Sequence, residues 1–122
     1  MKLLTKELQK ALPPLYSTEN EEDPMVVCKF FHPRSNWTWY VTEASLQTVK
    51  DGEELCIGLT EAIPEGAQPI DVLMFGLVDG FEAELGYISL RELASVRDDW
   101  GLGVERDIYW TPKRLSEVRE SL

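Results

Sequence analysis

Apolar and polar positions along residues 72–96 change their period twice, and each change falls at a turn or cap residue. Residues 72–78 form an apolar run broken only by Gly76, which predicts a strand covered on both faces. Asp79-Gly80 follows, a pair suited to the positive φ angles of a hairpin turn. Apolar and polar residues then alternate over residues 81–88, which predicts a second strand paired with the first.

This alternation gives the second strand two chemically different faces. One face carries Phe81, Ala83, Leu85 and Tyr87, and the other carries Glu82, Glu84, Gly86 and Ile88. A slip of one residue would exchange the two sets and bury Glu82 and Glu84. We therefore expect the aromatic and aliphatic set on the covered face of the sheet and the two glutamates on the wet face.

Three segments carry helix signals. Ser89 and Glu92 have the spacing of a capping box, in which the serine hydroxyl accepts the amide of the glutamate and the carboxylate reaches back. Thr5 is placed to cap a short helix that ends before Pro13-Pro14. Thr111-Pro112 fits the start of a terminal helix. The first of these helices follows the hairpin directly, so it is predicted to pack on the sheet.

The remaining β-prone runs predict further strands. Residues 25–32 and 37–43 are separated by the turn sequence Pro33-Arg34-Ser35-Asn36, which predicts a hairpin. Residues 104–110 predict one more strand after a loop. The elements together predict an α+β fold with a mainly antiparallel sheet, built from hairpins, and two or three short helices packed on it.

Two polar segments are expected at the surface of a single domain that spans residues 1–122. Residues 17–24 are acidic and predict an exposed loop. Residues 44–70 contain a turn signal at Asp51-Gly52 and a run at 54–59 that suits a strand. Several Pro and Gly residues punctuate the rest of this segment. We predict that residues 44–70 form a variable, mobile insert.

Negative charge is concentrated in one part of the chain. The 122 residues include 12 Lys and Arg against 22 Asp and Glu, which gives a net charge of −10. Residues 51–90 hold nine acids and no Lys or Arg. A field of this sign disfavours direct binding to nucleic acid or to an anionic membrane, and it favours a protein partner with a basic surface. A solvated acidic surface without a partner is the alternative.

The chain also carries information about its compartment. No apolar run approaches the roughly 20 residues of a membrane span. The first ten residues, MKLLTKELQK, have charges where a signal peptide needs an apolar stretch. We therefore expect a cytoplasmic protein in which Cys28 and Cys56 are reduced.

The sequence contains no familiar catalytic motif. His32 is the one histidine, and neither a phosphate-binding glycine loop nor a GxSxG elbow is present. The residues indicate no cofactor and no metal. An enzyme would have to use a carboxylate cluster, and the candidates are the carboxylates Glu43, Glu82 and Glu84 together with the guanidinium of Arg106. Glu82 and Glu84 would lie about 7 Å apart on one strand face, which suits acid–base work or a cation. Solvated glutamates on a wet face are the alternative.

Candidates for partner binding are of two kinds. Trp37 and Trp39 share one face of the predicted strand, and Tyr40 lies on the other. Burial of both tryptophans in the core is one interpretation, since aromatic residues dominate core area. An exposed aromatic patch for a partner is the other. The acidic candidates come from the charged window, and they are Glu53, Glu54, Glu61 and Glu65.

Short motifs spread over most of the chain indicate a family. They are Lys2-Leu3-Leu4-Thr5, Leu12-Pro13-Pro14-Leu15-Tyr16, Lys29-Phe30-Phe31, Pro33, Trp37-Thr38-Trp39-Tyr40, Glu43, Phe75-Gly76-Leu77-Val78, Gly80, Glu82, Glu84-Leu85-Gly86-Tyr87, Ser89-Leu90, Glu92-Leu93, Glu105-Arg106-Asp107 and Tyr109. In combination they resemble the uncharacterised bacterial family known as domain of unknown function 2958. The resemblance implies a mobile-element setting, on plasmids and integrative conjugative elements, and brings no established activity or site. Residues 44–70 match no part of the pattern.

Two functions of different classes follow. The leading hypothesis is a non-enzymatic, acidic protein-binding module. In one version it inhibits a host defence or nucleic-acid-processing protein by placing carboxylates in a basic groove. The alternative is a small hydrolase or metal-dependent enzyme. That alternative requires the four carboxylate-cluster candidates to converge in a cleft.

Overall fold

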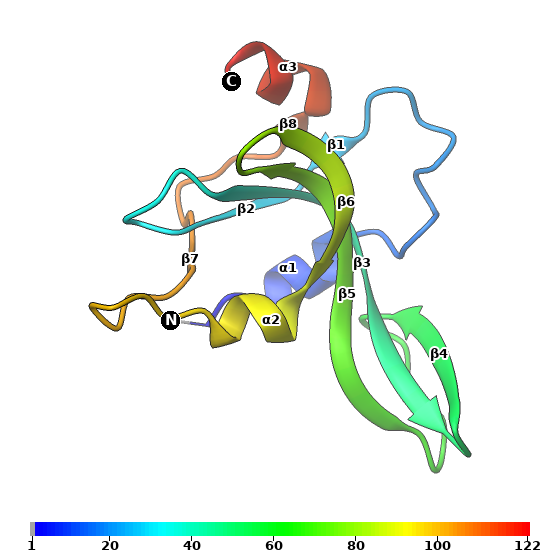
Figure 1. Cartoon of the computed structure of the whole chain (residues 1–122). Coiled ribbons are helices and arrows are strands. Elements are labelled where there is room, and N and C mark those ends of the chain that lie inside the picture. Colours follow the sequence, from blue (N-terminus) through cyan, green and yellow to red (C-terminus); the bar gives the residue numbers. More distant parts are fainter. Residues whose placement is uncertain (1) are drawn as a thin grey trace.

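The computed structural model describes residues 2–122 of the chain (Figure 1). Its main elements are a long antiparallel sheet and three short helices. In chain order the elements are α1 (Lys6–Ala11), β1 (Met25–Val26), β2 (Cys28–Phe31), β3 (Thr38–Lys50), β4 (Glu53–Gly58), β5 (Gln68–Asp79), β6 (Ala83–Ser89), α2 (Leu90–Ser95), β7 (Glu105–Arg106), β8 (Lys113–Arg114) and α3 (Leu115–Glu120). The predicted α+β class, mainly antiparallel and carrying short helices, is confirmed.

Strands β3 and β5 form the centre of the six-stranded sheet. The strand order is β6-β5-β3-β2-β7, and β4 pairs with the far half of β3 on the edge that β2 leaves free. A second sheet contains only β1 and β8. The far half of β3, together with β4 and the start of β5, extends away from the helices (Figure 1). We call residues 46–72 the distal arm.

Apolar side chains cover the two faces of the sheet unequally. The main core lies on the face that α1 and α2 cover, and it joins Leu3, Leu4, Leu12, Val27, Cys28, Phe30, Val41, Ala44, Met74, Ile88, Leu93 and Val104. A smaller core on the opposite face joins Val26, Tyr40, Leu77, Leu115 and Val118. The helix on that second face, α3, has only six residues. It covers only part of the face, and the rest remains exposed.

The predicted orientation of β6 is wrong. Ile88 is the buried residue of β6, and it lies in register with Met74 of the main core. Glu84 shares this face, since it pairs with Val78, whose side chain packs against the same core. Leu85 and Tyr87 point to the second face and are 48% and 55% exposed. The sequence pattern failed because β6 is an edge strand, where neither face is fully covered.

The predicted end of the second strand at Glu43 is also wrong, since β3 continues to Lys50. The far half of β3 has polar residues at buried positions, which conceals the strand pattern. Ser45 and Thr48 are buried, and the Thr48 hydroxyl donates to the carbonyl of Leu55. Residues 44–70 therefore belong largely to β3, β4 and β5. The variability of this segment stays a prediction.

The two predicted turn pairs behave differently. Asp51 and Gly52 both have positive φ, at 51° and 79°, and they join β3 to β4 in a two-residue hairpin. The predicted positive φ is found at neither Asp79 nor Gly80. Gly80 is required for another reason, because a Cβ atom there would lie 2.4 Å from the ring of Trp37.

The last third of the chain contains less regular structure than predicted. The expected strand over residues 104–110 is reduced to β7, since the chain turns where the amide of Trp110 donates to the carbonyl of Asp107. The terminal helix begins at Leu115 rather than Thr111, because residues 113–114 pair with β1.

Of the three helix caps predicted from the sequence, those at Thr5 and Ser89 are present, whereas the cap at Thr111 is not formed because α3 begins at Leu115. The Thr5 hydroxyl accepts the amide of Leu8, and the Ser89 hydroxyl accepts the amide of Glu92. Asp71, near the start of β5, accepts hydrogen bonds from the Ser89 hydroxyl and from the amide of Arg91. This carboxylate therefore ties the start of α2 to the sheet.

The contact between β3 and β5 at Gly76 leads to a test of stability. A Cβ atom on Gly76 would lie 1.9 Å from the carbonyl oxygen of Tyr40, whereas one on Gly86, its partner on β6, would meet nothing within 4 Å. We expect Gly76→Ala to lower the free energy of unfolding by about 3 kcal/mol, since backbone would have to move. Gly86→Ala should change it by less than about 0.5 kcal/mol. Urea unfolding measures both, and equal effects would contradict the close packing of β3 on β5.

Candidate functional site

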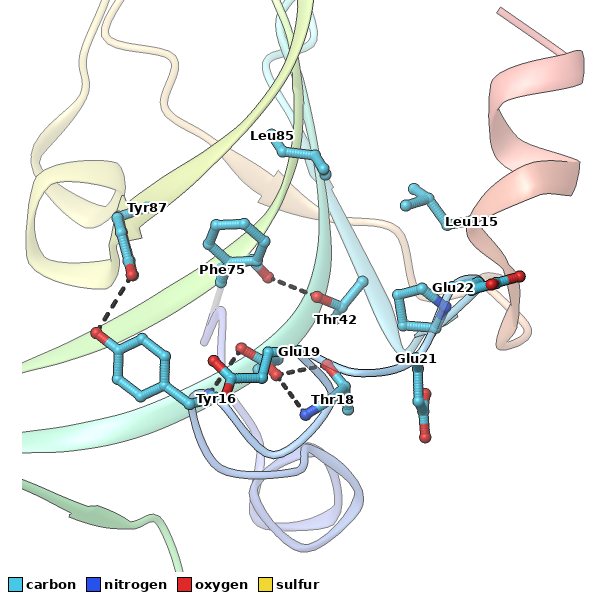
Figure 2. Close-up of a pocket in the computed structure, with 12 residues that line it drawn as sticks. Tyr16, Thr18, Glu19, Glu21, Glu22, Thr42, Phe75, Leu85, Tyr87 and Leu115 are labelled. Atoms are coloured by element: carbon cyan, nitrogen blue, oxygen red, sulfur yellow. Dashed lines mark hydrogen bonds between the residues drawn. The ribbon is translucent and has the colours of Figure 1, made fainter.

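An open groove of about 370 Å³ lies on the second face of the sheet, between β6 and the loop that follows α1 (Figure 2). The described residues that line it are Tyr16, Thr18, Glu19, Glu21, Glu22, Pro24, Thr42, Glu43, Phe75, Leu85, Tyr87 and Leu115. They include four glutamates and no Lys, Arg or His. We call this hollow the acidic groove.

Strand register places the apolar floor of the acidic groove. Tyr87, Phe75 and Glu43 are directly paired across β6, β5 and β3, so the three side chains form one row on the second face. The rings of Phe75 and Tyr87 meet edge to face, with centroids 5.3 Å apart. Leu85 and Leu115 extend this apolar surface toward α3.

Glu43 fastens one wall of the acidic groove. Glu43 is 5% exposed, and its carboxylate accepts the amide of Tyr16 at 3.0 Å and the amide of Thr18 at 2.9 Å. The hydroxyl of Thr18 donates to the same carboxylate. A buried carboxylate requires donors of this kind because burial removes its water. Glu43 therefore fixes the path of the loop, and its carboxylate lies at the base of the groove.

The two residues after Glu43 hold the same loop. The amide of Ala44 donates to the carbonyl of Pro13 at 2.9 Å, and the hydroxyl of Ser45 accepts the amide of Leu15 at 2.9 Å. A register shift between Val41 and Glu43 marks a bulge in β3 just before this segment. Bulges re-aim side chains and bend the strand. The bulge thus precedes the three residues to which the loop is bound.

Tyr16 has an unusual backbone conformation, with a φ of 70°. A residue with a Cβ atom seldom adopts this left-handed region, and it persists where surrounding contacts fix it. Here the bond from the Tyr16 amide to Glu43 supplies such a contact. The hydroxyl of Tyr87 donates to the hydroxyl of Tyr16 at 3.2 Å, which closes one end of the groove (Figure 2). This hydrogen bond, with partial burial and nearby acids, raises the pKa of Tyr87.

The exposed rim of the acidic groove ends at a helix cap. Glu19, Glu21 and Glu22 are exposed along the loop. Asp23 then accepts both the amide and the hydroxyl of Ser116, in the first turn of α3, at 2.8 and 2.6 Å. These bonds from Ser116 lower the pKa of Asp23 below its ordinary value. The rim is thereby tied to α3.

The four predicted carboxylate-cluster residues do not converge. Glu43 lies in the acidic groove, on the central strand β3. Glu84 lies on β6 and Glu82 in the turn before it, and both are exposed. Arg106 lies on β7, at the opposite edge of the sheet from β6, where it donates to the carbonyl of Lys2. Within residues 2–122 no group of three His, Cys, Asp or Glu side chains is arranged to hold a metal ion.

The predicted aromatic candidates are divided between the two sheet faces. Trp37 lies with its ring centroid 5.5 Å from that of Phe81, a residue that is 95% exposed. Trp39 stacks on Trp37 and packs against the main core. Tyr40 is buried on the second face beside Trp110. Of the three candidates, only Trp37 is associated with an exposed aromatic residue.

A second hollow, of about 470 Å³, lies beside Trp37 on the main-core face of β6. Its lining residues are Trp37, Val78, Phe81, Glu82, Glu84, Leu85 and Gly86. We call it the aromatic hollow. It contains two of the predicted catalytic carboxylates together with one predicted partner-binding residue, and Leu85 separates it from the acidic groove.

The predicted acidic candidates Glu53, Glu54, Glu61 and Glu65 are all exposed on the distal arm. Glu54 accepts a hydrogen bond from the side-chain amide of Gln47 on the neighbouring strand. None of the four lines the acidic groove. The carboxylates of the acidic window therefore lie outside the lining of that groove, although Phe75, Leu85 and Tyr87 from the same window form part of it.

A family model described as "Protein of unknown function (DUF2958)" matches residues 59–120, just over half of the 122 residues. The chain belongs to the DUF2958 family. No curated protein and no solved structure matches it.

The DUF2958 match includes the floor of the acidic groove, Phe75, Leu85, Tyr87 and Leu115, whereas Glu43 and the loop bound to it precede the matched residues. The family description assigns no activity. None of the helices that residues 2–122 form has the length and apolar character needed to cross a bilayer.

Sequence reasoning missed most of the acidic groove in this DUF2958 chain. It treated residues 17–24 only as an exposed loop and did not connect them to Glu43, which lies about 20 residues further along the chain. The available signal was Pro13-Pro14, which stops α1 and directs the chain into a turn. The row of Tyr87, Phe75 and Glu43 depends on strand register, which a single sequence does not fix.

The Glu43 network leads to a second test of stability. We expect Glu43→Ala to lower the free energy of unfolding by about 3 kcal/mol, because hydrogen bonds to a charged acceptor are lost and two amides lose their partner. Glu43→Gln keeps one acceptor oxygen and should cost less. Glu19→Ala, an exposed rim change, should stay within about 0.5 kcal/mol. Urea unfolding measures all three, and a Glu43→Ala variant as stable as Glu19→Ala would contradict the role of Glu43.

The Asp23 cap predicts a pH dependence with a definite sign. The folded pKa of Asp23 lies below its ordinary value of 3.8, so the contact contributes fully above that pH and is lost as the pH falls through the folded pKa. Ser116→Ala should therefore destabilise the protein more near neutral pH than in strong acid. The hydroxyl of Ser121, at the end of the same helix, donates to the backbone carbonyl of Val118, so Ser121→Ala should cost the same at each pH. Unfolding curves across this range test the difference, and a pH-independent Ser116→Ala effect would refute it.

Proposed function

We propose that this protein is a non-enzymatic, acidic protein-binding module that receives a basic side chain of its partner in the acidic groove. The observation that carries the proposal is the combination of an apolar floor with four glutamates and no cationic residue in the described lining. Lys and Arg side chains have the complementary structure, since their apolar stems pack on apolar surface while their charged heads stay at a polar rim.

The geometry of the groove favours a side chain over a simple ion. Phe75 and Tyr87 form a floor that a bare cation would leave uncovered, and the face of an aromatic ring attracts a guanidinium or ammonium group. Glu19, Glu21 and Glu22 stand at the exposed rim, where they would meet the charged end. Since rim charges act mainly on encounter rate and salt dependence, binding should weaken as salt is added.

The family and the net charge indicate in which context the module acts and which class of partner it binds. A net charge of −10 disfavours nucleic acid as the direct ligand. We propose a cytoplasmic location and a bacterial mobile-element context. The partner would be a host defence or nucleic-acid-processing protein, because such proteins have basic surfaces for phosphates that a carboxylate-rich protein fits.

The hydrolase alternative receives less support. It needs Glu43, Glu82, Glu84 and Arg106 in one cleft, whereas Glu84 and Arg106 lie at opposite edges of the sheet. Glu43 is occupied by loop amides and faces the other side of the sheet from Glu84.

Two charge-matched variants test the proposed function. The first removes the exposed rim charges of the groove (Glu19→Gln, Glu21→Gln and Glu22→Gln), and the second removes the same number on the distal arm (Glu53→Gln, Glu54→Gln and Glu61→Gln). The probe is a fluorescent peptide of about nine residues, rich in Val and Thr, with two adjacent arginines at its centre. Fluorescence anisotropy at low and high salt gives the Kd for each protein.

We expect the groove variant to bind the probe about tenfold more weakly than the wild type, since three rim charges contribute a few tenths to 1 kcal/mol each. The arm variant, which has the same net charge, should bind within about twofold of the wild type. Failure of the wild type to bind, binding insensitive to salt, or an equal loss in the two variants would overturn the groove as the binding site. Loss in the arm variant alone would move the site to Glu53, Glu54, Glu61 and Glu65.

A further inference from the structure

Strand β6 has one free edge next to both hollows. Among the strands of residues 2–122 it pairs only with β5, and it forms one end of the six-stranded sheet. Such an edge presents unpaired amides and carbonyls that another strand can use. Natural proteins usually cover or shorten an edge of this kind. Here its seven residues remain exposed except for Gly86, Ile88 and Ser89.

The side chains of this edge are unusual in their exposure. Phe81, just before the strand, is 95% exposed, and Leu85 and Tyr87 on the strand are 48% and 55% exposed. Apolar groups gathered in this way at a sheet edge mark an interaction surface more often than isolated apolar residues do. Gly86 leaves the centre of the opposite face open, since no atom lies within 4 Å of where its Cβ would be.

The two hollows lie on the two faces that β6 separates. The acidic groove uses Leu85 and Tyr87 on the second face, and the aromatic hollow uses Glu84 and Gly86 on the main-core face. Both contain aromatic rings and glutamates, and no Lys or Arg is among the described residues that line them. Successive side chains of an extended strand point to opposite faces of a sheet. A strand added beside β6 would therefore direct alternate side chains toward the two hollows.

We infer that the partner binds as an extended, basic segment that adds a strand to the free edge of β6, with one basic side chain in the acidic groove and a neighbouring one in the aromatic hollow. This inference rests on the proposed function and adds the conformation of the ligand and the spacing of its charges. Backbone hydrogen bonds would supply affinity, and the two hollows would select basic residues on opposite faces.

Charge decides against a second copy of this chain as the occupant. Each copy has a net charge of −10, and the described linings of the two hollows beside β6 contain glutamates without Lys or Arg. Two such edges would repel each other, since like charges brought close together are destabilising. A basic segment meets the same carboxylates with the favourable sign. The length of β6 corresponds to a bound segment of about seven residues, or roughly 23 Å.

Backbone methylation of the probe peptide tests the inference directly. Alternate amides of a strand point to the same neighbour, so methyl groups on one alternate set would block pairing with β6, and methyl groups on the other set would point away. Two peptides with the same sequence and the same number of N-methyl groups, placed on odd or on even amides of the central segment, are compared with the parent peptide by anisotropy.

We expect one N-methylated peptide to lose at least tenfold in affinity and the other to keep affinity near that of the parent peptide. Equal Kd values for the two would overturn strand addition, while groove-dependent, salt-sensitive binding of the parent would leave the proposed function standing. No binding of the parent would overturn both. The two failures are therefore distinguishable.

A pair of surface variants tests the aromatic hollow separately. Phe81 and Tyr109 are both strongly exposed, at 95% and 87%, so neither replacement by Ala should impair folding. Phe81 lines the aromatic hollow, whereas Tyr109 lies in the turn after β7. Phe81→Ala should weaken binding of the parent peptide about fivefold, and Tyr109→Ala should leave it unchanged. Equal effects of the two changes would remove the hollow from the binding surface.

Discussion

The buried carboxylate of Glu43 is the constraint on which the second face of the sheet depends. It is a charge within a strand, and it is tolerated because the amides of Tyr16 and Thr18 replace the water that it loses. The same hydrogen bonds fix the path of the loop after α1, including the left-handed backbone at Tyr16. The groove, its rim and the link to α3 all follow from where this loop is held.

The unequal cover of the sheet explains where apolar surface remains. Helices α1 and α2 complete a core on one face, whereas α3 protects only the part of the other face around Leu77 and Val118. The edge strand β6 extends beyond this cover, so Leu85 and Tyr87 stay exposed beside carboxylates. The described lining of the groove joins this apolar surface to four glutamates and contains no Lys, Arg or His, and the proposed basic, partly apolar ligand would complement both parts.

Local signals in the sequence predicted the elements better than the surfaces. The caps at Thr5 and Ser89 and the turn at Asp51-Gly52 depend on neighbouring residues, and all three are present. The orientation of β6 was mispredicted because alternation shows that two faces differ without showing which one the helices cover. The acidic groove depends on the bulge before Glu43 and on pairing across three strands. Neither feature produces a periodic pattern of apolar and polar residues in the sequence.

Where it meets β3, the loop beside the groove is held mainly through its main chain. Glu43, Ala44 and Ser45 bind the backbone of residues 13–18, and the side-chain hydroxyl of Thr18 is the one loop side chain that takes part in these bonds. Shape and chemical identity are therefore separable at this site. In the proposed binding mode, substitutions at Glu19, Glu21 or Glu22 would alter which ligand is preferred while the scaffold beneath them is preserved, so the groove could change along with the surface of its partner.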